Sequence, residues 1–364
     1  MISNVKIQSR FKLLIVTQAV DAGDSVLGFF VRWIEEFAKN AEHIDVICLQ
    51  EGKHDSLPAN VRVHSLGKEK GAPRFARRTT YALRFLSLAW RLRRDYDTVF
   101  VHMNPEYVVL GGLLWRTLGK RVGLWYVHRS VNLKLRIASF FSQNIFTASP
   151  EGFQLKTPKL HVVGHGIDTA AFRAPVRPFG TPARIVSVGR ITPIKNLDTL
   201  IEAVALLNER GIEATATLIG MPARPSDAAY LESLKALAQE RGIADKIRFA
   251  GSVPHAAMPE QYRAFDLSVN LSPKGGMDKA VLESMAAGLL VIVSNEAFAS
   301  LLGKHAGALM FRERDARDCA DKMESALRDT ERSLTARHDL VRTVGEMSIK
   351  NVTQKILYFY ETSS

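Results

Sequence analysis

The stretch SVNLSPKGGMDKAVLESMAAGLLVIVS, residues 268–294, decides the fold of this chain. It predicts a strand, a glycine turn, a helix and a second strand, in that order, at Ser268–Leu271, Gly275-Gly276, Lys279–Ala287 and Leu289–Val293. Asp278 is a favourable N-cap for the helix, and Gly288 ends it. The final apolar run has the length and β-branching of a buried parallel strand. The stretch is therefore one strand–helix–strand unit of a parallel sheet.

The start of this helix is a natural binding place for a phosphate group. Its free backbone N–H groups and the positive end of the helix dipole both favour an anion. Glu283 lies four residues after Lys279, so it shares that helix face and could meet a ribose in the same pocket. Any strand–helix–strand unit with a tight turn has a similar local pattern, so further signals are needed.

The composition is that of a globular protein with two domains. The chain has 364 residues, of which 46% are hydrophobic and 24% charged, enough for two cores of ordinary size. The apolar run Leu13–Val16 is too short for a signal peptide, and no stretch approaches the roughly 20 apolar residues of a membrane span. Two cysteines, Cys48 and Cys319, indicate neither a disulfide framework nor a metal cage. We expect a cytoplasmic protein.

The positive charge is concentrated in the first half of the chain. Residues 1–165 carry 24 Lys and Arg against 13 Asp and Glu, whereas residues 166–364 carry 25 against 24. The first half therefore holds nearly all of the net charge of +12 and is expected to face an anionic partner.

Strands and helices alternate through the first half. The predicted strands are Lys12–Val16, Ile44–Leu49, Arg62–Leu66, Thr98–His102, Arg121–Val127 and Asn144–Ala148. The predicted helices are Phe29–Lys39, Arg74–Arg94, Tyr107–Leu118 and Asn132–Phe141. This alternation predicts a doubly wound parallel sheet, whose ligands bind at the carboxyl ends of the strands. The loops at those ends hold Gly28, Asn104 and His128.

A second unit of the same kind follows a connection at Gly164–Pro182 that is rich in proline and glycine. Its first three strands are predicted at Arg184–Val188, Ala214–Ile219 and Lys246–Phe249, and its first three helices at Leu197–Glu209, Ala228–Arg241 and Ala256–Phe265. We therefore expect an α/β protein with two Rossmann-like domains, residues 1–165 and 166–346. The final segment, residues 347–364, is amphipathic and is expected to pack back toward the first domain.

Two cations follow the first strand of the second domain. Gly189 turns the chain and places Arg190 and Lys195 before the next helix. A guanidinium and an ammonium at the mouth of a parallel strand can neutralise a diphosphate. A loop Arg and Lys are often only solvated, but here a helix start that favours phosphate lies at a neighbouring strand end.

Three segments resemble the hallmark segments of glycosyltransferase family 4. They are VVGHGIDTAAF, GRITPIKNLDTLIEAVALL and GSVPHAAMPEQYRAFDLSVNLSPKGGMDKAVLESMAAGLLVIVS. The resemblance covers most of the second domain densely and the first domain more loosely. It implies the GT-B architecture, in which two Rossmann-like domains face a central cleft. It also implies a retaining, metal-independent hexosyltransferase with a nucleotide-diphosphate sugar as donor.

The resemblance implies roles for single residues of the second domain. Arg190 and Lys195 match the cationic pair on the donor pyrophosphate, and Glu283 matches the acidic residue on the ribose hydroxyls. Further donor contacts in this domain would come from Gly189, the main chain at Val253 and the helix start: Gly276, Met277, Asp278 and Lys279. In the first domain, Gly28 matches the loop glycine that lets this domain approach the donor phosphates.

In the first domain, His128 in LWYVHRS matches the histidine near the reacting sugar. With Arg190 and Lys195 it is expected to be catalytic, as a group that orients the sugar or the acceptor. Asn104 and Arg129 are expected on the acceptor side. An ordinary histidine at a strand end, with its hydrogen bonds satisfied, is the alternative for His128.

One position departs from the family pattern. The family usually has a second glutamate eight positions before Glu283, and here that position is Gly275. The carboxylate that would contact the donor hexose is therefore absent, and nearby Asp278 is a candidate substitute besides being a candidate cap. A non-catalytic nucleotide-sugar-binding protein of the same fold is thus an alternative to an enzyme.

No metal is expected at the site. Asp95-Tyr96-Asp97 is formally the DxD signature of another glycosyltransferase fold, but it lies between a basic helix and a strand, where an Asp marks a turn. No Cys/His pattern with zinc spacing and no Walker-type run occurs. A hydrolase would need two carboxylates flanking the sugar, which the sequence does not show.

The helix Arg74–Arg94 is strongly basic. Its arginines fall on one side, with Tyr81, Phe85, Leu88 and Leu92 among them: Arg74, Arg77, Arg78, Arg84 and Arg91. Phe75, Ala82, Leu86 and Ala89 are expected to form the stripe that faces the core. Arginines interleaved with apolar side chains suit an anionic membrane surface, where each cation adds about 1 kcal/mol.

We therefore expect peripheral association with the inner face of the cell membrane, and a glycan or lipid-linked acceptor presented to the first domain. A solvated helix face is the alternative reading of the arginines. A nucleic-acid-binding protein is a weaker rival, because only the charge supports it and no recognition helix or RNA-binding signature stands out.

Overall fold

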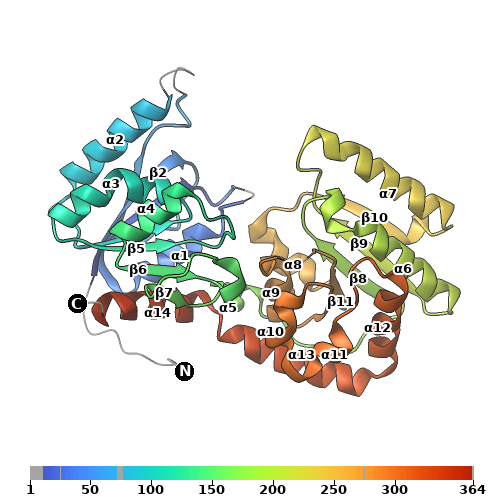
Figure 1. The fold of residues 1–364 in the computed structure, drawn as a ribbon. Helices are drawn as coiled ribbons and strands as arrows, with labels where there is room; N and C mark the ends of the chain where they lie inside the picture. Colours follow the sequence, from blue (N-terminus) through green and yellow to red (C-terminus); the bar gives the residue numbers. More distant parts are fainter. Residues whose placement is uncertain (1–10, 25, 72–76, 274, 363–364) are drawn as a thin grey trace. The chain divides into compact units, whose positions relative to one another are not determined.

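The computed structural model describes residues 11–24, 26–71, 77–273 and 275–362. Contacts between Cα atoms divide the chain into two compact units. Unit 1 consists of Met1–Gly166 together with Met347–Ser364, and unit 2 consists of Ile167–Glu346. Each unit is an α/β layer structure with its own parallel sheet (Figure 1).

Unit 1 contains a sheet of seven parallel strands in the order β3-β2-β1-β4-β5-β6-β7. The strands are β1 (Phe11–Val20), β2 (Ala41–Glu51), β3 (Val61–Ser65), β4 (Thr98–His102), β5 (Arg121–Trp125), β6 (Asn144–Thr147) and β7 (Leu160–Val162). The helices are α1 (Phe30–Ala38), α2 (Arg77–Arg91), α3 (Pro105–Thr117), α4 (Leu133–Phe141) and α14 (Ile349–Thr362). The sequence order reverses direction between β1 and β4, as in doubly wound sheets.

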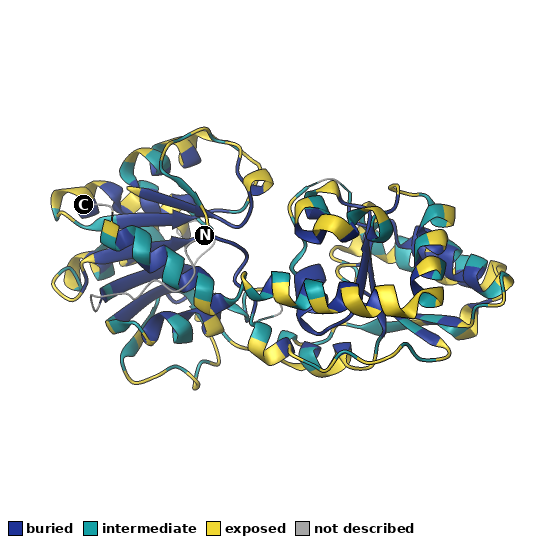
Figure 2. Ribbon diagram, turned by 90° about the horizontal axis from the view of Figure 1, so that it is seen from below, coloured by how far each residue is buried: buried dark blue, intermediate teal, exposed yellow. Residues whose placement is uncertain are grey.

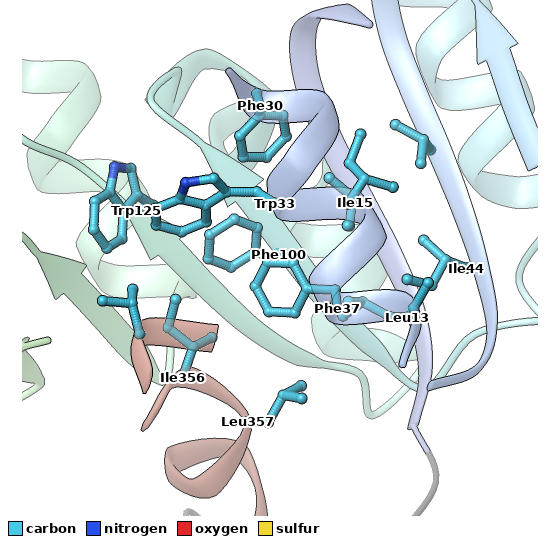
Figure 3. Packing of buried hydrophobic residues seen from close by; sticks show 14 of the residues in the cluster. Leu13, Ile15, Phe30, Trp33, Phe37, Ile44, Phe100, Trp125, Ile356 and Leu357 are labelled. Carbon is cyan, nitrogen blue, oxygen red and sulfur yellow. The ribbon is translucent and has the colours of Figure 1, made fainter. Parts of the chain in front are cut away.

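The two faces of this sheet carry separate hydrophobic cores. One core joins the strands to α1 and α14, and the other joins them to α2, α3 and α4. Figure 3 shows the first core, where Phe30, Trp33 and Phe37 of α1 point onto the sheet beside Phe100. The ring of Trp33 meets that of Trp125 edge-on, with centroids 4.9 Å apart.

Helix α14 belongs to unit 1 although it lies at the end of the chain. Tyr360 is fully buried, and its hydroxyl donates a hydrogen bond of 2.7 Å to the carbonyl oxygen of Val99. Arg121 donates in turn to the carbonyl oxygen of Tyr360 at 3.0 Å. Gly123 makes room for this ring, because a Cβ there would lie 2.2 Å from the tyrosine oxygen. The helix is therefore part of the unit 1 core.

Unit 2 contains a sheet of five parallel strands in the order β10-β9-β8-β11-β12. The strands are β8 (Ala183–Val188), β9 (Ala214–Ile219), β10 (Ile247–Gly251), β11 (Leu267–Asn270) and β12 (Leu290–Val293). The helices are α5 (Thr169–Phe172), α6 (Leu197–Glu209), α7 (Ala228–Glu240), α8 (Met258–Tyr262), α9 (Lys279–Ala286), α10 (Ala299–Leu302), α11 (Ala306–Leu309), α12 (Ala316–Arg328) and α13 (Thr330–Gly345).

The predicted fold class is confirmed, and the elements differ from prediction in detail. Strand β7, the short helix α5 and the helices α10, α11, α12 and α13 were not predicted, and α5 lies inside the expected connection. The helix expected at Ala256–Phe265 is a 3₁₀ turn, His255–Ala257, followed by α8. Figure 2 shows the sheets as buried, with the longer helices buried on one side and exposed on the other. None of the described helices is both long enough and apolar enough to cross a membrane.

One prediction for the basic helix was wrong. Phe85 was placed among the arginines, but it is fully buried against Tyr107 and Trp115. Ala89 is also fully buried, whereas Ala82 and Leu86, the other described members of the predicted stripe, are only half-buried. The stripe that faces the core is therefore rotated toward Phe85, and Phe75 lies outside the described residues.

Candidate functional site

The residues predicted to bind a diphosphate lie at the carboxyl edge of the unit 2 sheet. A small hollow opens at the ends of β8, β9 and β11, and its lining includes Gly189, Arg190, Lys195 and Ser272. Arg190 is exposed and forms no hydrogen bond or ion pair with any residue that the structure describes. The structure therefore brings both predicted cations to one hollow, with the guanidinium available to an anion.

Two glycines keep the strand ends beside this hollow close together. Gly189 has a φ of 156°, which favours glycine. A Cβ on Gly220, at the end of β9, would lie 1.8 Å from the carbonyl oxygen of Gly189. Any side chain at position 220 would therefore push the two strand ends apart.

Lys195 is held by the turn that carries it. It ends a 3₁₀ turn, and the next residue, Asn196, has a left-handed backbone with a φ of 45°. The side chain of Asn196 donates to the carbonyl oxygen of Leu271 at 3.3 Å and accepts from Arg314 at 3.1 Å. Asn tolerates this backbone conformation better than most residues. These bonds fix the turn against the end of β11.

The ammonium of Lys195 is paired with Asp278. Nζ donates to Oδ2 of Asp278 at 2.8 Å and to the hydroxyl of Ser272 at 2.7 Å. The same Oδ2 also accepts from Asn270 at 2.9 Å and from the Ser272 hydroxyl. Burial by itself raises the pKa of Asp278, but the charge of Lys195 and these hydrogen bonds outweigh it and lower the pKa. One carboxylate oxygen is thus saturated by three donors.

This arrangement corrects the predicted cap. Asp278 occupies the N-cap position of α9 in an extended conformation, but its side chain makes no capping hydrogen bond. A free carboxylate at this position normally accepts from the helix N–H groups. The competing contact with Lys195 draws it away, so the first N–H groups of α9 are not occupied by this side chain.

The start of α9 carries the other predicted donor contacts. Gly276 is exposed, Met277 and Lys279 are half-buried, and the Asn295 amide donates to the carbonyl oxygen of Gly276 at 3.2 Å. Burial lowers the pKa of Lys279 to about 7, and the neighbouring Glu283 carboxylate opposes this only in part. A lysine at the start of a helix also meets the positive end of the helix dipole. The position therefore strongly favours an incoming anion.

Glu283 is buried in the second turn of α9, with 7% of its surface exposed. Its Oε1 lies 2.9 Å from Nε2 of His255, a residue that the sequence reasoning missed. His255 begins the 3₁₀ turn after β10, two residues beyond the half-buried Val253. The pair therefore connects the loop predicted to meet the base with the helix predicted to meet the phosphates.

Gly275 has room for a side chain. A Cβ built on it would have only the carbonyl oxygen of Pro273 within 4 Å, at 3.8 Å. Among the described residues, crowding is therefore not the reason that the expected glutamate is missing.

In unit 1, Gly28 lies in the loop between β1 and α1 and is buried. A Cβ on it would lie 2.6 Å from the carbonyl oxygen of Asp24 and 2.9 Å from that of Ala22. The Asp24 carboxylate accepts from the backbone N–H groups of Val26 and Leu27 at 2.8 and 2.7 Å. Glycine is therefore needed here for the loop itself, whatever else it contacts.

The other predicted residues of unit 1 follow neighbouring strands. Asn104 comes after β4 and is the N-cap residue of α3, with its amide donating to the carbonyl oxygen of His102 at 3.2 Å. His128 and Arg129 come after β5 and are exposed, and the His128 ring meets Tyr126 edge-on. With Gly28 after β1, these residues share the carboxyl edge of three adjacent strands.

Sequence reasoning also missed His102, the last residue of β4. Its ring stacks on Phe30 with centroids 4.0 Å apart, and its Nδ1 lies 3.3 Å from the Thr17 hydroxyl. Met103 follows with a φ of 68°, which is unusual for a residue other than glycine. The strained backbone of Met103 could mark this sheet edge as a functional site. That strain is visible in the structure but not in the sequence.

The predicted membrane-surface arginines differ in their surroundings. Arg78 and Arg91 are exposed. Arg84 is also exposed, but it donates to the carbonyl oxygen of Leu66 at 2.7 Å. Arg77 begins α2, and Arg74 lies outside the described residues. Two large apolar side chains of the same helix, Leu83 and Trp90, are 68% and 50% exposed.

The DxD tripeptide lies at the amino end of β4, opposite to the strand ends that carry the other residues. Tyr96 is buried, and its hydroxyl donates to the carbonyl oxygen of Ala89 at 2.9 Å. Asp97 accepts hydrogen bonds from Thr98 and Arg121. These hydrogen bonds stabilise the turn that Asp95, Tyr96 and Asp97 form before β4.

Comparison with known proteins bears on the second unit most directly. Residues 168–342 match the family model for group 1 glycosyl transferases. The second unit is therefore similar to the group 1 glycosyl transferases over nearly its whole length. The matched range contains the whole hollow, both cations and α9.

Curated members of this group align over part of their length. The chain is 26% identical over 234 residues to a D-inositol 3-phosphate glycosyltransferase of Jonesia denitrificans, covering 60% of this chain and 53% of the relative. It is 28% identical over 214 residues to the lipopolysaccharide core biosynthesis mannosyltransferase LpsB of Rhizobium meliloti, covering 55% and 60%. The chain thus spans little more than half the length of these group 1 glycosyltransferases.

Solved structures match almost the whole chain. HepE of Anabaena, in complex with UDP and glucose, superposes with a TM-score of 0.74 at 15% identity, covering 97% of this chain and 100% of that one. A sucrose-phosphate synthase from Thermosynechococcus elongatus superposes with a TM-score of 0.73 at 17% identity, covering 96% and 98%. At such identities the likeness concerns the fold, and this chain has the GT-B fold with its two Rossmann-like units.

Proposed function

We propose that this protein is a retaining, metal-independent glycosyltransferase. It would move a hexose from a nucleotide-diphosphate sugar to a glycan or lipid-linked acceptor at the cytoplasmic face of the cell membrane. The observation that carries the proposal is the hollow of unit 2, which Arg190 and Lys195 both line and where Lys195 contacts Asp278 at the start of α9. All three features attract a leaving diphosphate.

The chemistry follows from the charge that develops in the reaction. The bond between the anomeric carbon and the diphosphate oxygen breaks, and the sugar becomes oxocarbenium-like. The acceptor oxygen forms the new bond on the same face, and its proton passes to a phosphate oxygen of the leaving group. Arg190, Lys195 and the start of α9 stabilise the departing charge, and each well-placed donor contributes roughly 3–4 kcal/mol. These protein cations supply the charge that a metal ion supplies in other transferases.

The donor nucleotide is assigned to unit 2. Glu283 receives the ribose hydroxyls, the main chain at Val253 meets the base, and Gly276, Met277 and Lys279 line the diphosphate and sugar. One fold neighbour was solved in complex with UDP and glucose, and one relative is named for GDP-mannose, so either base is compatible with the group. These names support a nucleotide-sugar donor as a class.

The carboxyl edge of the unit 1 sheet is assigned to the acceptor. His128 would orient the reacting sugar or acceptor, with Asn104 and Arg129 beside it and Gly28 allowing a close backbone approach to the donor phosphates. His128 and Arg129 are exposed, as groups that meet a second substrate must be.

A membrane surface is the proposed partner of α2. Exposed Arg78 and Arg91 share this helix with exposed Leu83 and Trp90, a mixture that suits an anionic lipid interface. Three apolar side chains of α3 and α4, the helices that join α2 in one hydrophobic core, are also more than half exposed: Leu113, Leu133 and Phe140. Relatives named for lipopolysaccharide core and phosphatidylinositol mannoside support a lipid-linked acceptor.

Two measurements test the proposal. A thermal-shift screen against UDP, GDP, ADP and their common sugar conjugates identifies the donor, because a ligand that binds only the native state raises its melting temperature. Transfer of radiolabelled sugar from the donor so found to membrane extracts then tests catalysis. Stabilisation by one nucleotide class followed by labelled product is expected, and no stabilisation by any nucleotide would sink the proposal.

The alternative is a nucleotide-sugar binder without catalysis, which the glycine at position 275 favours. It predicts the same thermal stabilisation but no labelled product with any acceptor fraction. The two functions are therefore separated by the second measurement alone.

A further inference from the structure

One oxygen of the Glu283 carboxylate has a hydrogen-bond partner among the described residues, and the charge of Lys279 lies nearby. Oε1 of Glu283 lies 2.9 Å from Nε2 of His255, and in the part of the chain that the structure describes no hydrogen bond reaches the other oxygen, Oε2. Only 7% of the surface of Glu283 is exposed, so its charged group is poorly hydrated. A buried carboxylate with one occupied and one open oxygen is suited to accept a hydrogen bond from a ligand.

His255 is itself fixed in place. It begins the 3₁₀ turn that follows β10, and its ring meets Phe172 edge-on with centroids 5.8 Å apart. Phe172 is buried, with 2% of its surface exposed. A ring held in this way can hold the carboxylate in one rotamer at little further cost in conformational entropy.

The pair joins two separate elements of unit 2. His255 belongs to the loop after β10, and Glu283 belongs to α9, whose first turn contains Lys279. In the proposed function the loop after β10 meets the base, and helix α9 meets the diphosphate. The ribose of a nucleotide lies between its base and its phosphates. The contact of His255 with Glu283 likewise lies between the element assigned to the base and the element assigned to the diphosphate.

We propose that His255 is a positioning residue that turns the open oxygen of Glu283 toward a ribose hydroxyl and so makes the site selective for ribonucleotides. The inference rests on the proposed function. Because an ionised carboxylate only accepts hydrogen bonds, the Nε2 of His255 carries the proton of this contact. Without that donor the carboxylate would rotate or take up water, and the energetic difference between a ribose and a deoxyribose would shrink.

The test measures nucleotide affinity by calorimetry rather than transfer. The probes are UDP, 2′-deoxy-UDP and 3′-deoxy-UDP, with the guanosine series in parallel because the base is not assigned. His255→Phe keeps an aromatic ring against Phe172 but has no donor. His255→Gln keeps a donor that can reach Glu283, and it serves as the rescue variant.

The wild-type protein is expected to lose about tenfold or more in affinity when one ribose hydroxyl is removed, as for a hydrogen bond to a charged group. In His255→Phe this ratio should fall to about twofold, and His255→Gln should restore most of it. Affinity for the deoxynucleotide should stay nearly constant in all three proteins, which a general structural defect would not allow.

Three other outcomes would overturn the positioning role of His255. An unchanged ribose-to-deoxyribose ratio in His255→Phe overturns the positioning role while leaving the proposed function intact. Equal losses for ribose and deoxyribose ligands, without rescue by His255→Gln, assign the histidine a purely structural role and also overturn it. No nucleotide binding by the wild type would overturn the proposed function together with this inference.

Discussion

Lys195 and Asp278 form an ion pair of 2.8 Å at the place where a diphosphate is expected to bind, although they lie 83 residues apart in sequence. The candidate phosphate site therefore contains its own counter-ion. The pair is partly exposed, with 19% of the lysine side chain and 33% of the aspartate side chain accessible. An incoming phosphate must share or replace the aspartate as partner of the ammonium, and this makes both residues informative to change.

Replacing Lys195 by Ala should lower sugar transfer by about 10²-fold or more, because charge stabilisation of the leaving group is lost. The measurement is kcat/KM with the donor found in the nucleotide screen. Lys235→Ala is the matched control, since this lysine is exposed on α7 and pairs with Glu232. Near-normal turnover of the Lys195 variant would show that this ammonium has no catalytic role.

Replacing Asp278 by Asn should tighten the binding of a free nucleoside diphosphate by about three- to tenfold, because a negative charge beside the phosphates is removed. The gain should shrink as salt is raised, since screening weakens the repulsion. Calorimetric titration at two ionic strengths measures both effects. Weaker binding by the variant would instead mean that the aspartate serves mainly to hold Lys195 in place.

Lys279 should make the stability of unit 2 depend on pH. Burial lowers its pKa in the folded protein to about 7 from its ordinary value of 10.5. Between these values the unfolded chain binds more protons, so the lysine's destabilising effect is complete below about pH 7 and is relieved as pH rises toward the unfolded value. Lys279→Met should therefore raise the melting temperature more at about pH 6.5 than at about pH 10. An equal gain at both pH values would contradict a lowered pKa for this lysine.

Arg337 should be important for the stability of α9. It is 4% exposed, donates to the carbonyl oxygen of Gly288 at 2.6 Å, and also donates to that of Arg177. Arg337→Met would leave both carbonyls without this donor and should cost about 3 kcal/mol in the free energy of unfolding of unit 2. Arg342→Met, on the exposed side of the same helix, is the control and should change it by less than about 0.5 kcal/mol. Similar losses in both variants would count against the buried hydrogen bonds as the cause.

Neutralising Arg78 and Arg91 by Gln should weaken binding to vesicles that contain phosphatidylglycerol by about 1 kcal/mol per charge, without weakening nucleotide binding. Sedimentation with neutral and anionic vesicles across a salt series measures the effect. Arg241→Gln and Arg263→Gln, in unit 2, form the control pair. Unchanged vesicle binding would identify α2 as a solvated face, and co-sedimentation with oligonucleotides instead would favour the nucleic-acid reading.

Much of the fold could be predicted because strand and helix periodicity is local information. The central strands are continuous apolar runs, and glycine or an N-cap residue marks many boundaries. Strand β7 escaped because its three residues, Leu160–Val162, are not a buried apolar run. Helices α10 and α11 have four residues each, which is too short for a helical period to be visible.

The site was predictable only where its chemistry is tied to a strand end. Arg190 and Lys195 could be found because each follows a predicted strand within a few residues. The partner of Asp278 could not be found, since the local preference of Asp for an N-cap competes with a lysine far away in sequence. His255 gave no signal for the same reason: its contact with Glu283 spans 28 residues and two elements. Phe85 was misplaced because the positions of the arginines alone do not fix which side of a helix faces the core.

The chain passes from unit 1 to unit 2 near residue 166 and returns near residue 347, where α14 joins the sheet it left. A ribosome would release unit 2 complete while unit 1 still lacked its last helix, with the cavity for Tyr360 unfilled. The first unit to be synthesised is therefore the last to be finished. Separating the two by a single cut after residue 166 would leave one fragment without its closing helix and the other with a loose, partly apolar tail.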